Sequence, residues 1–314
     1  MAKTTHPSHW DIVISDTLHE IELKVDEAER IQEMIARLNC YDQSQKLSPE
    51  VIDFIGNYSS VEIVSKEGLV MEAGALLKKA FEALMNAIKW LIEKLAMIFK
   101  YLFNSEFRAC KDALDLQRRF ITMSINRTLV NAFESKTCDV IVKKDIDGIV
   151  FKTQRLVELV RNAASLTRQD FTDTLITTYC NESGVQFDPN TCRVSDNLPN
   201  PTPMRSTTFG TAGWTMQGIV ETMSNYLATL KQIETLKEVN KQCEDAVKDL
   251  KKRAEEASLS GVGADKITEL QKECAAKICM TKVIGYAIAV CCRRSENILA
   301  FLNQLYGASK EATK

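Results

Sequence analysis

The histidines, which most often carry proton transfer in enzymes at neutral pH, occur only near the start of this 314-residue chain. They are His6, His9 and His19. A Ser–His or Cys–His pair is therefore unavailable to the rest of the sequence. His6 and His9 have a spacing that could hold a metal ion weakly, but solvated side chains at a chain end account for them more simply. The sequence predicts no catalytic, cofactor-binding or metal-ligating residue, and hence a protein that is not an enzyme.

The other charged clusters predict solvated surface rather than chemistry. Glu255-Glu256 lies on the charged face of a predicted helix, and no apolar pocket that would raise a carboxyl pKa can be inferred beside it. Arg118-Arg119 and Arg293-Arg294 are basic doublets that could contact phosphate. Because aromatic residues do not alternate with them and no nucleotide-binding motif occurs, they predict at most sequence-independent contact with DNA.

The ten cysteines do not form a metal-binding pattern, since no CxxC pair occurs. We expect reduced thiols that serve as small apolar residues. Cys180 and Cys192 are the exceptions, because they flank a loop and could approach each other. Most of the others fall within helical patterns, namely Cys110, Cys243, Cys274, Cys279, Cys291 and Cys292.

The stretch that must organise any fold is 73–103, which reads AGALLKKAFEALMNAIKWLIEKLAMIFKYLF. Its polar residues recur every three or four positions and form a narrow stripe on an apolar helix. Such a helix must be covered by the fold, by a membrane or by another protein, and a core helix is the favoured interpretation. The stripe consists of Lys78, Lys79, Glu82, Asn86, Lys89, Glu93 and Lys100.

Composition favours helices throughout, because a chain with 45% hydrophobic residues contains only 12 Gly and 6 Pro. The first ten residues lack the apolar core of a signal peptide. The apolar run 283–292 is too short to cross a bilayer, and charges interrupt 73–103. We expect a soluble protein that is made in a cytoplasm.

Helix-start signals divide the remaining N-terminal part of the chain. Asp16 is a candidate N-cap for a helix to about residue 38, and Pro49 suits the first position of a second helix. After residue 103 the helical pattern resumes to about Phe133. Residues 138–152 leave two alternatives: a strand pair that turns at Asp147-Gly148, or a helix from about Asp145 to Tyr179.

The C-terminal third predicts two long helices. Residues 183–213 hold four of the six prolines and predict a mobile linker. From Trp214 apolar residues step by three and four to Ala254, and after a Gly-containing break the pattern returns to Tyr306. The prediction is an all-α multi-helix bundle with a long C-terminal antiparallel helical hairpin.

Charge is distributed unevenly along the chain. Residues 1–67 hold 6 Lys and Arg against 13 Asp and Glu, a net charge of −7. The whole chain has a formal net charge of −2, so residues 68–314 carry +5. An asymmetry of this kind is typical of a segment with a separate role.

The junction of these two parts resembles a known class of protein. The sequence VEIVSKEGL, followed by the Lys-punctuated apolar helix that ends in FKYLF, resembles the internal head (inner-body) proteins of large tailed bacteriophages. The resemblance implies an acidic propeptide that a prohead protease removes after a small residue, any residue, and Glu. Ser65-Lys66-Glu67 fits this motif, with cleavage between Glu67 and Gly68. Ala132-Phe133-Glu134 and Ser309-Lys310-Glu311 also match it.

The resemblance implies a non-enzymatic virion structural protein in the interior of the phage head, assembled in the host cytoplasm. Its partners would be the prohead protease, other capsid or head-interior proteins, and DNA through non-specific charge contacts, and ejection with the DNA is compatible with it. The implied parts are an acidic propeptide (1–67), a helical body (68–182), a Pro-rich loop (183–213) and the hairpin (214–314). Two alternatives stay open: a membrane-active or pore-forming protein that inserts 73–103, and a cytoplasmic coiled-coil adaptor.

Overall fold

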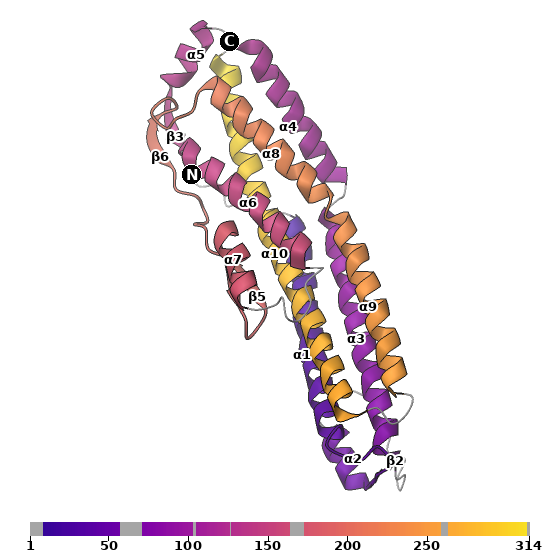
Figure 1. The fold of residues 1–314 in the computed structure, drawn as a ribbon. Coiled ribbons are helices and arrows are strands. Elements are labelled where there is room, and N and C mark those ends of the chain that lie inside the picture. Colours follow the sequence, from indigo (N-terminus) through magenta and orange to yellow (C-terminus); the bar gives the residue numbers. More distant parts are fainter. Residues whose placement is uncertain are drawn as a thin grey trace.

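The computed structural model describes residues 9–56, 71–102, 105–125, 127–163, 173–258 and 263–312. Within these ranges the chain is mainly helical, with short strands in two-stranded sheets, which confirms the all-α prediction. Figure 1 shows an elongated molecule whose two halves share one long helix, α10 (Ala264–Ala312).

One half of the molecule is built on the predicted central helix. That helix is α3 (Ala73–Leu102), and it packs against α1 (His9–Leu38), α9 (Lys237–Ser258) and α10. Most of its apolar positions are buried, with Met97 an exception, whereas its stripe of Lys, Glu and Asn side chains is exposed. The prediction of a core helix is therefore confirmed, and the polar stripe is its solvent face.

The other half surrounds the C-terminal part of α10. Here α4 (Ser105–Ser124) packs on α8 (Met216–Glu234), which also contacts α6 (Lys143–Ala163). α5 (Arg127–Glu134) lies near the end of α10. The buried indole of Trp214 anchors this half, because its Nε1 donates a hydrogen bond of 2.6 Å to the Ile141 carbonyl and its ring lies 5.5 Å from that of Phe301.

Smaller elements connect these helices. α2 is Pro49–Gly56, which confirms the predicted proline start, and α7 is Asp173–Ser183. The strands pair antiparallel as β1 (Lys46–Leu47) with β2 (Met71–Glu72), β3 (Thr137–Val140) with β6 (Arg205–Thr208), and β4 (Val185–Asp188) with β5 (Arg193–Asp196).

Three predicted helix boundaries are wrong. Asp16 is not an N-cap, because α1 already begins at His9 and Asp16 lies inside it. The helix after residue 103 is divided into α4 and α5. The first arm of the hairpin is also divided: Thr235 caps α8, and Leu236 precedes α9. The heptad-like spacing continues across this break, so the pattern alone could not reveal it.

The strand pair at Asp147-Gly148 is wrong and the helix alternative is right. Both residues lie inside α6, where a Cβ on Gly148 would meet nothing within 4 Å. The strand β3 does form, but its partner β6 is distant in sequence, with Thr137 opposite Thr208. The proposed continuation to Tyr179 is α6 followed by α7, and residues 164–172 lie outside the described ranges.

The prediction of a linker without structure at 183–213 is also wrong. This segment contributes β4, β5 and β6, and its apolar residues Val185, Val194 and Phe209 are buried. A side-chain turn closes the β4–β5 hairpin, since Asp188 accepts hydrogen bonds from the Asn190 amide and the Thr191 hydroxyl. The prolines therefore mark turns between strands.

The described residues of 1–67 join the same apolar core as those that follow. On α1, buried side chains such as Ile21, Val25 and Ile31 face α3 and α10. α1 approaches α10 closely at Gly285, where an added Cβ would lie 3.0 Å from a methyl group of Leu18. Among the described helices, α10 alone is long and apolar enough over 18 residues to cross a bilayer, and 67% of that window is buried inside the protein.

Candidate functional site

A cleft of about 1300 Å³ lies where the β4–β5 hairpin meets α1 and α10, two helices that are far apart in the sequence. α7 closes one side of it. The floor comes from one face of α10, whose residues recur at helical spacing as Tyr286, Ala289, Val290 and Arg293. Polar side chains line the walls, including His19, Glu22, Asn181, Asp188, Arg193 and Asn197.

A three-residue cluster joins the cleft walls. The Tyr286 hydroxyl on α10 donates a hydrogen bond to the Glu22 carboxylate on α1. Arg193 on β5 lies 3.7 Å from the same carboxylate and 5.3 Å from the centre of the Tyr286 ring. Burial, together with the Glu22 carboxylate, raises the pKa of Tyr286, so this phenol stays a hydrogen-bond donor. The cluster ties three separate elements together.

Beneath the cleft, Arg294 holds the hairpin from inside the protein. Its side chain is 3% exposed, and Asp196 on β5 accepts from its Nη2 at 2.8 Å. Arg294 also donates to the backbone carbonyls of Ser183 at 2.8 Å and Gly184 at 3.0 Å. The guanidinium therefore donates hydrogen bonds both to the carbonyl groups at the end of α7 and to the hairpin carboxylate.

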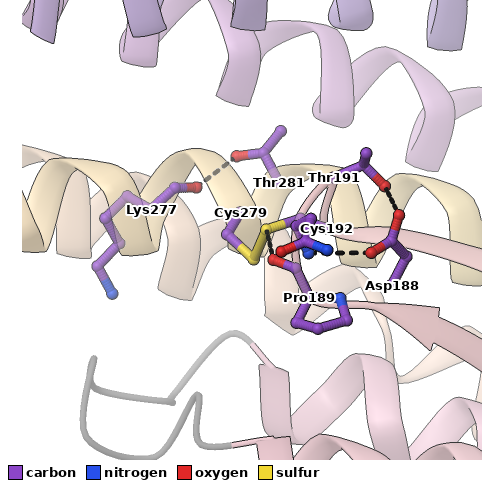
Figure 2. The surroundings of a disulfide bond; sticks show 8 residues. Asp188, Pro189, Thr191, Cys192, Lys277, Cys279 and Thr281 are labelled. Carbon is purple, nitrogen blue, oxygen red and sulfur yellow. Dashed lines mark hydrogen bonds between the residues drawn. A yellow bond between two sulfur atoms is a disulfide. The ribbon is translucent and has the colours of Figure 1, made fainter. Parts of the chain in front are cut away.

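A disulfide fixes the tip of the same hairpin. Figure 2 shows Cys192, next to the Asp188 turn, bonded to Cys279 on α10, with the two Cα atoms 5.3 Å apart. The φ of Cys192 is 52°, in the left-handed region that few non-glycine residues adopt. The expected approach of Cys180 to Cys192 is wrong: Cys180 is buried beside the cleft and carries a thiol.

The buried cysteine thiols have low reactivity. Burial raises the pKa of Cys180, Cys243, Cys274 and Cys291 to about 12 each. Because the thiolate is the reactive form, these groups are unreactive near neutral pH. These four thiols agree with the prediction of reduced cysteines that serve as small apolar residues. The prediction is wrong for Cys279, which is bonded to Cys192.

These thiols predict that the fold loses stability at alkaline pH. Their ordinary pKa is 9.0, so above about pH 9 the unfolded chain releases protons that the folded chain retains up to about pH 12. The stabilisation is complete below pH 9 and declines as pH rises, by up to about 1.4 kcal/mol per pH unit for each thiol. Urea unfolding at a series of pH values measures this slope.

The matched comparison is between a buried and an exposed thiol. Cys274→Ala should make the alkaline slope shallower, whereas Cys40→Ala, at an exposed position, should leave it unchanged. An identical slope for both variants and the native chain would show that buried thiols do not set the alkaline limit.

The charged residues singled out in the sequence are dispersed. Arg118 and Arg119 both pair with Asp115 on α4. Arg294 is buried, so only Arg293 of the second doublet is exposed to contact phosphate. Glu255 and Glu256 form ion pairs one turn back along α9, as expected of a solvated face. Within the described residues, no three His, Cys, Asp or Glu side chains are grouped to hold a metal ion.

The predicted processing residues Ser65, Lys66, Glu67 and Gly68 lie outside the described residues. The elements on either side are described: α2 ends at Gly56, and β2 begins at Met71 and pairs with β1. The two other motif matches lie in helices. Phe133 of α5 is fully buried against Phe209, and Ser309 of α10 is 1% exposed.

Neither the disulfide nor the buried arginine that holds the β4–β5 hairpin could be identified from a sequence motif. Cys192 and Cys279 are 87 residues apart, in a predicted linker and a predicted helix. Arg294 has the same residue type as its exposed neighbour Arg293, and only the helix position separates them.

Comparison with protein-family models, with curated proteins and with solved structures finds no match to this chain.

Proposed function

We propose that this chain is a non-enzymatic structural protein of the interior of a tailed-phage head, and that a prohead protease matures it by cleavage after Glu67. Other head-interior proteins are its proposed partners, together with DNA through non-specific charge contacts. The observation that carries the proposal is the position of α1, the main helix of the acidic segment, along the apolar helix α3.

The contact between α1 and its neighbours explains what a propeptide would do here. α1 covers apolar side chains of α3 and α10 that would otherwise face water. Each fully buried large aliphatic side chain is worth about 1.5–3 kcal/mol relative to exposure. A segment that covers this surface during assembly and is later removed would expose it only inside the head.

Cleavage alone would not release the acidic segment. β1 precedes the proposed cleavage point and β2 follows it, and the two strands pair with Lys46 opposite Glu72 and Leu47 opposite Met71. The packing of α1 on α3 and α10 also needs no covalent connection through residue 67. The cleaved protein is therefore expected to remain a complex of two chains until one of them is degraded or displaced.

Removal of residues 1–67 would also change the electrostatics of the body. The precursor has a net charge of −2, and the remaining 68–314 would carry +5. A basic body attracts the DNA phosphates that the acidic segment repels, and this attraction weakens as salt rises.

The test uses protein from its native source, analysed by intact mass and N-terminal sequencing. Under denaturing conditions we expect a chain that starts at Gly68. Native mass spectrometry of protein that has just been cut should show this chain together with residues 1–67. A chain that starts at Met1 or Ala2 in mature particles would overturn the proposal.

A matched pair of variants tests the cleavage point. Ser65-Lys66-Glu67 and Ser309-Lys310-Glu311 are identical tripeptides, but the second lies in α10, where Glu311 pairs with Lys136. Glu67→Ala should block processing when the variant is made during infection, whereas Glu311→Ala should be processed normally. Normal processing of Glu67→Ala would place the cleavage elsewhere.

A membrane-active function is the second candidate, favoured by the apolar 18-residue window in α10. Because 67% of this window is buried, insertion would require the helix bundle to open. Liposome flotation of the full chain and of the 68–314 product separates the two functions. Binding by the shorter product alone would support membrane insertion after cleavage.

A further inference from the structure

α4 presents a continuous apolar seam to solvent. The helix packs on α8 and α10 through its buried residues Phe107, Leu114 and Ile121. On another face, apolar residues recur at alternating spacings of four and three, as in a coiled coil. These are Ala109, Ala113, Leu116, Phe120 and Met123, which we call the α4 seam.

The α4 seam is unusually open for residues of this kind. Leu116 is 67% exposed and Met123 is 81% exposed. Ala109 and Ala113 are exposed, and Phe120 is partly covered by Tyr306, whose ring lies 5.7 Å away. In Figure 1, α4 lies at the outer edge of the molecule. Exposed apolar stripes of this length are typical of interaction sites.

The order of side-chain sizes along the seam suits a second copy of itself. In an antiparallel pair, one helix can be placed so that Ala109 lies opposite Phe120 of the other copy, and Ala113 opposite Leu116. Each small residue then faces a large one, the arrangement that lets two helices interdigitate. A two-fold axis repeats both contacts, because each surface is its own partner.

The flanking charges agree with the same register. Asp112 and Arg119 occupy equivalent positions beside the seam, one heptad apart, and both are exposed. In the antiparallel register Asp112 of one chain lies beside Arg119 of the other, twice per dimer. Arg119 already pairs with Asp115 at 2.7 Å but stays 65% exposed, and its guanidinium has donors to spare. A parallel pair would place Asp112 beside Gln117 instead.

We propose that two copies of this chain associate through the α4 seam as an antiparallel, two-fold symmetric pair. The seam spans about 22 Å, so the contact is at the small end of specific interfaces and the association is reversible. The proposal does not depend on the proposed function, since α4 lies outside the segment that processing would remove.

Sedimentation equilibrium of the full-length chain, measured over a concentration series, tests the pairing. The weight-average mass should rise from that of one chain toward that of two. Leu116→Asp should stay monomeric throughout, because it places a charge at the centre of the seam. Leu23→Asp is the matched control, because Leu23 is 58% exposed on α1, and it should associate like the native chain. A native chain that stays monomeric, or equal association by both variants, would overturn the proposal.

A charge exchange tests the register separately. Asp112→Arg and Arg119→Asp should each raise the dissociation constant about tenfold, since each replaces two attractions with two repulsions. The double variant restores opposite charges in the antiparallel register and should recover native association. Failure of the double variant to recover, with unchanged helix content by circular dichroism, would exclude this register.

Discussion

Arg294→Ala is expected to lower the free energy of unfolding by about 3–5 kcal/mol, the usual cost of removing one partner of a buried ion pair. The substitution leaves the Asp196 carboxylate without its cation and takes a donor from the Ser183 and Gly184 carbonyls. The melting temperature should fall by roughly 5–8 °C, because an unfolding entropy of about 2.1 cal/mol/K per residue amounts to about 0.66 kcal/mol per degree for 314 residues. Thermal unfolding followed by circular dichroism measures both quantities when combined with urea titration.

Two variants show whether the effect comes from this network. Arg293→Ala changes the adjacent exposed residue and should alter stability by less than about 0.5 kcal/mol. Arg294→Lys keeps the charge but not the forked donors of the guanidinium. Its free energy of unfolding should therefore lie between those of Arg294→Ala and Arg293→Ala. Equal stabilities for the two alanine variants would mean that the buried contacts contribute nothing measurable.

Breaking the disulfide should have the second largest effect. Cys192 and Cys279 close a loop with a sequence separation of 87, for which loop-closure entropy gives an upper value of about 4.6 kcal/mol. Measured losses on removing such bonds are smaller, and we expect Cys192→Ser to lose about 2–4 kcal/mol. Urea unfolding with and without reductant measures the loss.

The reductant supplies the internal check. Native protein treated with reductant should match Cys192→Ser, and Cys192→Ser itself should not respond to reductant. Cys40→Ser removes an exposed thiol and should behave like the native chain in both conditions. If reductant leaves the native unfolding midpoint unchanged, Cys192 and Cys279 are not bonded in solution.

Helices were predictable because their signal is local. The polar stripe of α3 placed that helix to within one residue of its observed end, and Pro49 marked the start of α2. The strand partner of β3 was not predictable, because Thr137 pairs with Thr208, which is distant from it in the sequence. For α10, apolar residues occur on nearly every side, so the pattern could not identify which helices cover which face.

The site was harder to predict than the fold, because it depends on contacts between distant residues. Glu22, Arg193 and Tyr286 come from three elements, and none of them belongs to a recognisable motif. The linker prediction is wrong because prolines also occur in the turns between ordered strands, as they do in 183–213. Its alternating apolar residues Val185 and Phe187 instead pack a hairpin against α7 and α10.

The length and position of α10 constrain how the chain folds during synthesis. This 49-residue helix spans about 74 Å, contacts α1, α3, α4 and α6, and follows all four of them along the chain. At about 5–20 residues per second, the synthesis of α10 is completed roughly ten to fifty seconds after that of α1. During that interval α1 can pack against α3, but the apolar faces of both helices that later contact α10 remain exposed to other apolar surfaces. The growing chain is therefore most vulnerable to aggregation until α10 has been synthesised.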